Sequence, residues 1–223
     1  MRLVTWNTGH RADTRSQAEF LRGLAPDAIA LQEVIRTSLE RWKPLLREIG
    51  LPHFISPVRD PMRAYSGVLI ASKTPVHVLS PADGAMDTEC RWPNMHASLS
   101  VQLANGIRLH TACLWGELPD RREVIHSAMS RRGRHPTILA GDLHGDESDD
   151  PLALRKFGMR DVYLDLHGHD EAACSLVAGT RSDHVFASGD LRVRRAKYWT
   201  EKMGTIAEGG LSDHAPLEVV LDL

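Results

Sequence analysis

The sequence predicts an α+β protein in which a few helices pack on a largely antiparallel or mixed system of β-sheets. Its first part alternates strand-like and helix-like periodicity in the order strand, helix, strand, helix. The remainder consists mainly of short, partly alternating apolar runs separated by Gly, Pro, Asn and Asp, which is typical of antiparallel strands. One of these separators, Asn105-Gly106 in "QLANGIRL", is the strongest short-range signal of a β-hairpin. Helices beside such a run of strands indicate helix layers packed on sheets.

The N-terminal helices are predicted from periodicity and from end signals. The segment from Asp13 to Ala25 is expected to be helical, because its apolar residues share one face and Asp13 or Ser16 can cap its first turn. A second amphipathic helix is expected from about Ser38 to Ile49, where a glycine and a proline soon follow. A strand-like run precedes each helix: "RLVTWN" and "DAIALQE".

One further helix is expected in the rest of the chain, from near Pro119 to about Arg131. Runs with strand character recur on both sides of it. They are "HFIS", "SGVLIAS", "VHVLS", "HASLSVQL" and "IRLHTACLW" before the helix, and "TILAG", "DHVFAS", "RVRRAKYW" and "APLEVVLDL" after it.

A single domain over residues 1–223 is expected. The chain is 42% hydrophobic and 25% charged, as is ordinary for a soluble globular protein, and its length suffices for one large core. It contains no repeat of fixed period and no Pro, Gly or Ser linker long enough to divide it. We expect the domain to act as a monomer.

A cytoplasmic location is expected from three features. The start, "MRLVTWN", runs directly into a strand pattern without the features of a signal peptide. No apolar stretch approaches the roughly 20 residues needed to span a bilayer, so no membrane span is expected. The three cysteines are odd in number and lack metal-finger spacing, which fits a reducing compartment.

The charge pattern leaves the role of two basic segments open. A formal net charge of -2 argues against a polycation that coats nucleic acid. Residues 121–135 and 181–202 are nevertheless locally rich in Arg and Lys. These segments either follow a phosphate backbone or form ordinary solvated faces.

Polar residues used in phosphate chemistry stand at, or beside, the ends of several predicted strands. Neighbouring strands would gather these ends at one edge of the sheets. In "PTILAGDLHGDESDDP", an Asp and a His with i, i+2 spacing project to the same side of an extended segment. The residues concerned are Asn7, Glu33, His110, Asp142 with His144, and Asp213 with His214.

The ordered motifs around these residues resemble the endonuclease/exonuclease/phosphatase superfamily, which includes deoxyribonuclease I and the exonuclease-type abasic-site endonucleases. The resemblance covers essentially the whole chain. It implies a four-layer α/β/β/α sandwich, in which two mixed β-sheets lie face to face and are flanked by helices. The motifs are "VTWN", "LQEV", "SGVLIASK", "LHTA", "GDLH", "RSDHVFAS" and "SDHAP".

The resemblance implies a metal-dependent phosphoester hydrolase, and the chemistry of the residues agrees. A phosphodiester is anionic, so a hard divalent ion held by carboxylates is the expected catalyst, here Mg²⁺ or Mn²⁺. Glu33 would be the main ligand, and Asp213 would lie close to the ion or to a water on it. Asn7 would orient a neighbouring carboxylate or a phosphate oxygen, at the edge of both the metal and the substrate sites.

Four further residues receive catalytic roles. Asp142 would position the attacking water and remove its proton. His214 would donate a hydrogen bond to the scissile phosphate, while Asp183 accepts from its other ring nitrogen and fixes the tautomer. His110 would protonate the leaving oxygen or stabilise the transition state, with Asp60 as the acid that could brace it. The alternative for His110 is a hydrogen-bonded histidine within a sheet.

Three positions bear on the substrate. His144 stands where most relatives place Asn, and its ring would either donate to the phosphate or reach the ion and favour Mn²⁺. Arg91, in "ECRWPNMH", resembles the family's Arg-x-Pro, whose arginine contacts a substrate phosphate in the deoxyribonuclease branch. The adjacent Trp92 would stack on a base or cover the sheet.

The most favoured activity is a nuclease acting on DNA or RNA. The alternative is a small-molecule or lipid phosphodiesterase or phosphomonoesterase on the same site, because the fold hosts all of these. The short chain leaves little room for long loops that grip duplex DNA, which favours a single-stranded or small substrate. A binding protein without catalysis is less favoured, because Glu33, Asp142 and Asp213 are all present.

Overall fold

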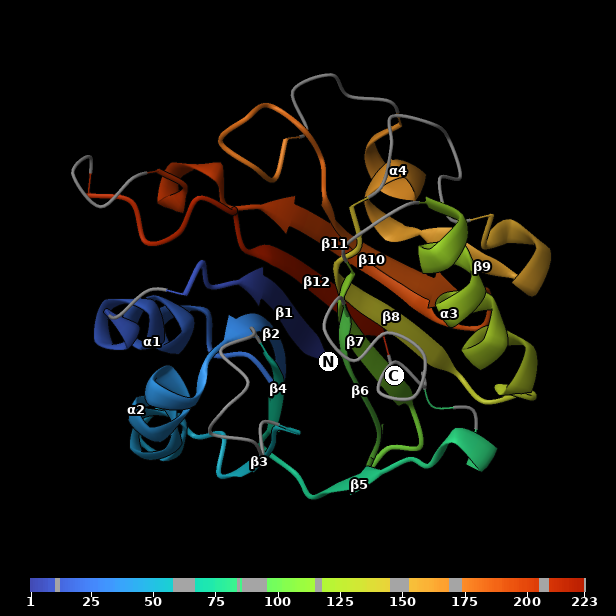
Figure 1. Ribbon diagram of the computed structural model, residues 1–223, viewed down its shortest axis with the longest axis horizontal. Helices are drawn as coiled ribbons and strands as arrows, with labels where there is room; N and C mark the ends of the chain where they lie inside the picture. Colours follow the sequence, from blue (N-terminus) through green and yellow to red (C-terminus); the bar gives the residue numbers. More distant parts are fainter. Residues whose placement is uncertain are drawn as a thin grey trace.

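Two β-sheets lie face to face, and helices cover their outer faces (Figure 1). The computed structural model describes residues 1–10, 13–57, 67–83, 85, 96–114, 118–144, 153–168, 174–204 and 209–222. Each sheet has six strands. The four-layer α/β/β/α sandwich of two mixed sheets expected from the sequence is therefore confirmed.

The first sheet has the strand order β11-β12-β1-β2-β4-β3. Its centre is the parallel pair of β1 and β2, while the other neighbours are antiparallel. Every residue of β2 is buried, as expected of a central strand covered on both faces. The strands are β1 (Arg2–Asn7), β2 (Ala28–Val34), β3 (His53–Ile55), β4 (Gly67–Ser72), β11 (Arg192–Tyr198) and β12 (Leu217–Asp222).

The second sheet has the strand order β5-β6-β7-β8-β10-β9. The pair of β7 and β8 is parallel, and the others are antiparallel. The predicted hairpin is confirmed, because β6 and β7 pair across Asn105-Gly106. The strands are β5 (Val76–Val78), β6 (His96–Leu103), β7 (Arg108–Leu114), β8 (Thr137–Asp142), β9 (Met159–Asp161) and β10 (Asp183–Ser188).

The three predicted helices are confirmed within one or two residues at each end. They are α1 (Thr14–Leu24), α2 (Arg36–Glu48) and α3 (Leu118–Arg131). The cap of α1 is Asp13, whose carboxylate accepts from the Ser16 backbone N–H at 3.2 Å. Figure 1 shows α1 and α2 together on the first sheet and α3 on the second.

Among the described strands and α-helices, two short ones were not predicted. They are β9 and the helix α4 (Val162–His167), which follows it directly and packs near β10 and β11. A strand of three residues has no measurable period, and a helix of six residues has less than two turns. Asp161 stabilises the junction, because its carboxylate accepts from the backbone N–H groups of Tyr163 and Leu164.

Three apolar clusters hold the layers together. One lies between the sheets, one between the first sheet and its two helices, and one between the second sheet and α3. Polar groups also join the sheets: the Gln32 amide donates to the Thr111 hydroxyl of the opposite sheet at 2.8 Å and to Thr5 at 3.1 Å. Among the helices of the described ranges, none is long and apolar enough to cross a membrane.

Candidate active site

Side chains from both sheets converge where β1, β2, β7 and β8 end and β10 begins. Within the second sheet, Cys113, Asp142 and Asp183 are direct neighbours across three adjacent strands. Asn7 and Glu33 reach the same place from the first sheet, as their contacts show. The site is therefore assembled from segments far apart in the sequence.

Asn7 links the carboxylates of the two sheets. Its amide nitrogen Nδ2 donates to Glu33 Oε1 at 3.1 Å and to Asp142 Oδ2 at 2.9 Å. Its oxygen Oδ1 accepts from the Gly9 backbone N–H at 3.0 Å, which fixes the orientation of the amide. Because Asn7 is fully buried and both of its amide protons are engaged, its side chain holds the two carboxylates in a fixed orientation.

Glu33 is placed by an irregularity in its strand. The register of β2 against β4 shifts between Gln32 and Val34, and Glu33 lies in this bulge with a φ of 56°. Its second oxygen, Oε2, lies 3.1 Å from His10 Nε2. A bulge turns the side chain away from the normal alternation of the strand, so Glu33 reaches the shared edge of the sheets.

Backbone strain is concentrated at this site. In the described part of the chain, the non-glycine residues with positive φ are His10, Ala25, Glu33, His144 and Ala153. His10, Glu33 and His144 belong to the site. This conformation costs a non-glycine residue on the order of 1 kcal/mol and persists only where its surroundings impose it.

Gly141 allows Asp142 to reach the site. Its φ is 145°, and a Cβ at this position would lie 2.1 Å from the backbone oxygen of Ala112 on the neighbouring strand. Only glycine fits such a close approach of two backbones. The turn after the strand is held by Arg121 of α3, whose Nη1 donates to the Leu143 carbonyl at 2.9 Å.

Asp142 is a buried carboxylate with one engaged and one unengaged oxygen. Oδ2 accepts from Asn7, lies 3.4 Å from His144 Nε2 and accepts from the Cys113 thiol at 3.8 Å. Oδ1 is buried and has no hydrogen-bond partner among the described residues. Burial raises the pKa of Asp142, but the His144 and His214 rings and the Asn7 amide hold it below its ordinary value. Asp142 is therefore ionised at neutral pH.

Asp183 and His214 form a buried pair beside Asp142. His214 Nδ1 lies 2.7 Å from Asp183 Oδ2. Burial lowers the pKa of His214, but Asp183, with smaller contributions from Asp142 and Asp213, raises it to about 9. His214 is therefore an imidazolium at neutral pH, and Nε2–H is its second donor. Trp6 holds the backbone of His214, because its Nε1 donates to the His214 carbonyl at 3.0 Å.

The remaining predicted residues lie differently. Asp213 is exposed, and its Oδ1 accepts from the Ser212 hydroxyl at 3.3 Å. It belongs to neither group of potential metal ligands described below. The prediction that Asp213 lies close to a metal ion, or to a water bound to it, stays a prediction.

His110 is not brought to the site. It is fully buried, its Nδ1 lies 2.8 Å from the Ser100 hydroxyl, and burial together with Arg108 lowers its pKa to about 3. Its neighbour two residues on, Ala112, packs in the cluster under α3, so His110 lies on the outer face of the sheet. Its burial and its lowered pKa both speak against the predicted role of His110 in protonating the leaving oxygen or stabilising the transition state. The alternative, a hydrogen-bonded histidine within a sheet, describes it.

Several predicted residues lie outside the described part of the chain. They are Arg91, Trp92 and Asp60.

The basic segments are largely occupied by internal contacts. Arg121 is buried, and Arg132 Nη2 donates to the Phe157 carbonyl at 2.7 Å. In the second segment, Arg181 pairs with Asp161 at 2.9 Å. Four further cations of that segment, Arg192, Arg194, Arg195 and Lys197, pair with Asp222, Glu218 or Glu201. This favours the interpretation as solvated faces over a track for phosphates.

Two residues of the site were missed in the sequence. Cys113 lies three positions after His110, so strand alternation places the two side chains on opposite faces. The alternation of side chains along "LHTACL" indicates that His110 and Cys113 lie on opposite faces of the strand. It does not indicate which of these faces packs against the other sheet. His10 follows "TWNTG" in a turn, and no periodicity marked it.

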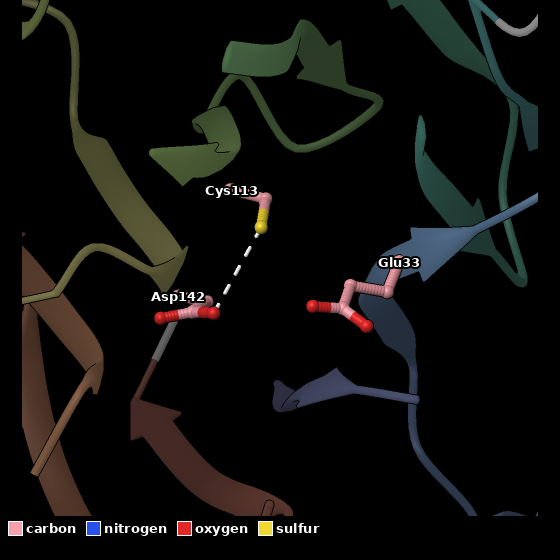
Figure 2. A group of neighbouring side chains, drawn as sticks. All are labelled: Glu33, Cys113 and Asp142. Atoms are coloured by element: carbon pink, nitrogen blue, oxygen red, sulfur yellow. Dashed lines mark hydrogen bonds between the residues drawn. The ribbon is translucent and has the colours of Figure 1, made fainter. Parts of the chain in front are cut away.

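Among the residues that the structure describes, two groups of side chains could hold a metal ion, and both include Asp142. They are Glu33, Cys113 and Asp142, shown in Figure 2, and Asp142, Asp183 and His214. In each group, one potential ligand atom per residue lies within 4.8 Å of the others. Two buried carboxylate oxygens, Asp142 Oδ1 and Asp183 Oδ1, have no hydrogen-bond partner within the described ranges. A bound cation would stabilise the negative charge of these carboxylates. The donor set therefore fits a divalent cation.

Comparison with known proteins identifies the family. The model of the endonuclease/exonuclease/phosphatase family matches residues 4–214. A comparison with curated proteins gives no match.

Solved structures share the fold over the whole chain. An AP endonuclease from Archaeoglobus fulgidus has a TM-score of 0.76 and 18% identity, with 100% of both chains covered. A 3' phosphatase from Neisseria bound to a product DNA hairpin has a TM-score of 0.74 and 18% identity, again with 100% of both chains covered. An endonuclease/exonuclease/phosphatase from Beutenbergia cavernae has a TM-score of 0.75 and 20% identity, covering 100% of this chain and 71% of the other.

Proposed function

We propose that this chain, which belongs to the endonuclease/exonuclease/phosphatase family, is a divalent-metal-dependent phosphodiester hydrolase that acts on nucleic acid. Family members are hydrolases of phosphoester bonds. The observation that carries the proposal is the convergence of Glu33 and Asp142 on the Asn7 amide beside the charged His214. The two carboxylates would bind a divalent ion that also contacts the phosphate of a phosphoester, and the His214 imidazolium would bind the same phosphate from the other side.

Glu33 and Asp142 would hold the ion, which is Mg²⁺ or Mn²⁺ in this proposal. When bound, such an ion neutralises charge on the non-bridging oxygens of the phosphate. Asn7 keeps the two carboxylates in place without adding a third negative charge. His10, 3.1 Å from Glu33 Oε2, orients that carboxylate from the solvent side.

Asp142 is proposed to position the attacking water and accept its proton. Its Oδ1 is buried and has no partner in the described part of the chain, so it is free to accept such a hydrogen bond. His214 would donate Nε2–H to the phosphate, while Asp183 holds Nδ1 at 2.7 Å. His144 would supply a further donor near Asp142.

Nucleic acid is the proposed substrate because relatives with this fold act on it or bind it. One is named an AP endonuclease and another is a 3' phosphatase bound to DNA. A small phosphoester is the second candidate, and one observation favours it. Most cations of the segment 181–202 are paired with acids of this chain, which leaves fewer of them to contact a long phosphate backbone.

A substrate panel tests the proposal. Single-stranded and double-stranded DNA, RNA, and bis- and mono-p-nitrophenyl phosphate would be incubated with Mg²⁺, Mn²⁺ or Ca²⁺, with an EDTA control. The proposal expects cleavage of an oligonucleotide in Mg²⁺ or Mn²⁺ and none in EDTA. Turnover of only the small esters would favour the second candidate, and turnover of none would leave a binding protein. Action as a cytoplasmic monomer is also proposed, in line with Cys113 and Cys174, neither of which forms a disulfide within the described residues.

A further inference from the structure

We propose that Cys113 is a metal ligand in this centre, so that the site binds a thiophilic divalent ion, such as Zn²⁺ or Co²⁺, more tightly than Mg²⁺. The proposal deepens the proposed function by assigning a metal class to the same site. It predicts two states of one residue: a thiol that donates to Asp142 when a hard ion is bound, and a thiolate ligand when a thiophilic ion is bound.

The geometry of three side chains supports this assignment. Glu33, Cys113 and Asp142 come from β2, β7 and β8 and point toward one another (Figure 2). One potential ligand atom from each lies within 4.8 Å of the other two. Cys113 Sγ and Asp142 Oδ2 are 3.8 Å apart. A tetrahedral zinc ion with ordinary bond lengths separates a sulfur and an oxygen ligand by about 3.6 Å, so this pair needs almost no movement.

A second observation also indicates a ligand. Asp142 is only 1% exposed, yet its Oδ1 has no hydrogen-bond partner within the residues that the structure describes. A buried carboxylate oxygen without a partner is costly, because burial removes its water without replacing it. A cation bound between Asp142 and Cys113 would partly neutralise this carboxylate through Oδ2, the oxygen that faces Cys113 (Figure 2), and would leave Oδ1 for the attacking water of the proposed function.

The thiol in this group of ligands favours a borderline or soft ion. Thiolate and imidazole ligands suit Zn²⁺ and Co²⁺, whereas Mg²⁺ prefers oxygen ligands and retains its waters. Two rings flank the carboxylates: His10 Nε2 is 3.1 Å from Glu33 Oε2, and His144 Nε2 is 3.4 Å from Asp142 Oδ2. Histidine and carboxylate partners of this kind orient ligands and raise metal affinity.

Binding of a thiophilic ion exchanges a proton for a bond. The sulfur–hydrogen bond of Cys113 breaks, a sulfur–metal bond forms, and the proton passes to the buffer. No oxidant or reductant is involved. The competing explanation is that Cys113 is a small apolar residue of the cluster between the sheets, where it also lies. The two explanations differ in spectrum, affinity and proton release.

Co²⁺ is the probe that separates them, because a thiolate bound to Co²⁺ gives a charge-transfer absorption in the near ultraviolet and an oxygen ligand does not. The full chain carrying Cys90→Ser and Cys174→Ser, in which Cys113 is the remaining cysteine, would be titrated with Co²⁺. Its matched partner carries Cys113→Ser as well. We expect the band to appear at one equivalent in the first protein and to be absent in the second. Cys113→Ala, checked by circular dichroism, would guard against misfolding of the serine variant.

Calorimetry gives the affinities. We expect Cys113→Ser to weaken Zn²⁺ binding by at least about 10-fold and to remove the proton release that two buffers of different ionisation enthalpy report. Mg²⁺ affinity should stay within about 2-fold, because a hard ion does not use the sulfur. A missing band together with unchanged Zn²⁺ affinity in folded protein would overturn the proposal. Mg²⁺-dependent hydrolysis would survive that failure, whereas a Cys113-dependent band without any hydrolysis would count against the proposed function alone.

Discussion

Asn7 links the two sheets by hydrogen bonds, because its side-chain amide donates both to Glu33 of the first sheet and to Asp142 of the second. Near it, His10, Glu33 and His144 have a positive φ, a backbone conformation that non-glycine residues rarely adopt. Such strain is stable only in a rigid frame. The site therefore depends on the packing of strands that carry no functional group.

Gly141→Ala tests the close approach that admits Asp142. The new Cβ would collide with the Ala112 backbone oxygen, 2.1 Å away, and the φ of 145° excludes a side chain. We expect the free energy of unfolding to fall by at least about 3 kcal/mol, measured by urea denaturation. Gly23→Ala is the matched control: its Cβ meets nothing within 4 Å in α1, and it should stabilise the helix by about 0.5–1 kcal/mol. Equal effects of the two variants would refute the argument.

His144 is tested by a pair of substitutions. Its Nε2 lies 3.4 Å from Asp142 Oδ2, and a third of its side chain is exposed. If the ring acts as a donor, His144→Asn should retain most of the Mg²⁺-dependent activity, because an amide can donate as well. His144→Ala should lose about 10- to 100-fold in kcat, about 1.4 to 2.7 kcal/mol. His53→Ala, at an exposed position of β3, is the control. Wild-type kinetics in His144→Ala would remove the residue from the site.

The sequence predicted which residues have side chains suited to the reaction better than it predicted where those side chains point. Asn7, Glu33, Asp142 and His214 stood at strand ends, and these ends do lie together. His110 and Cys113 belong to one strand, and a choice of face decides which of them reaches the site. That choice depends on which sheet packs behind the strand, which no local pattern contains.

At the scale of elements, Asp161 joins β9, α4 and β10. It accepts from two backbone N–H groups of α4, pairs with Arg181 at 2.9 Å and lies 3.1 Å from His184 Nδ1. Burial raises the pKa of Asp161, but His184 and Arg181 outweigh it and lower the value to about 2. The folded state therefore favours the ionised carboxylate.

Asp161→Asn should destabilise the protein in a pH-dependent way. Since the folded pKa is below the unfolded one, the contribution is present above about pH 4 and is lost as the pH falls toward 2. A shift from 3.8 to about 2 corresponds to roughly 2 kcal/mol. Urea unfolding should show the full difference at pH 7 and only about a third of it at pH 2.5. Asp165→Asn, an exposed partner of Arg160, should change stability by less than about 1 kcal/mol. A pH-independent loss at Asp161 would contradict the explanation.

The same elements show why their prediction was incomplete. The long helices and the Asn105-Gly106 hairpin have periodicity and end signals, and they were predicted. The junction of β9 and α4 is held by the contacts of Asp161 with Arg181 and His184, which are 20 and 23 residues away in the sequence. Contacts of this range determine short elements, and a local pattern cannot report them.

The four-layer arrangement of the molecule brings the strand ends of the two sheets together. The Gln32 amide binds Thr111 of the opposite sheet directly below this edge. Local patterns predicted sheets with helices on them, while the face-to-face arrangement came from the resemblance of ordered motifs. The pairing of two sheets is a property of the complete core, so periodicity within one strand cannot specify it.

Glu33→Gln tests whether Glu33 and Asp142 form a metal-dependent hydrolytic centre. The amide retains the size of the side chain and an oxygen for Asn7, but it removes the charge that holds the ion. Glu48→Gln, at an exposed position of α2 that pairs with Arg15, is the control. Hydrolysis of an oligonucleotide and of bis-p-nitrophenyl phosphate in saturating Mg²⁺ should fall by at least about 100-fold in kcat/KM in the first variant and remain at the wild-type level in the second, with both variants folded. Wild-type turnover in Glu33→Gln, or no metal-dependent turnover in the wild type itself, would contradict the account.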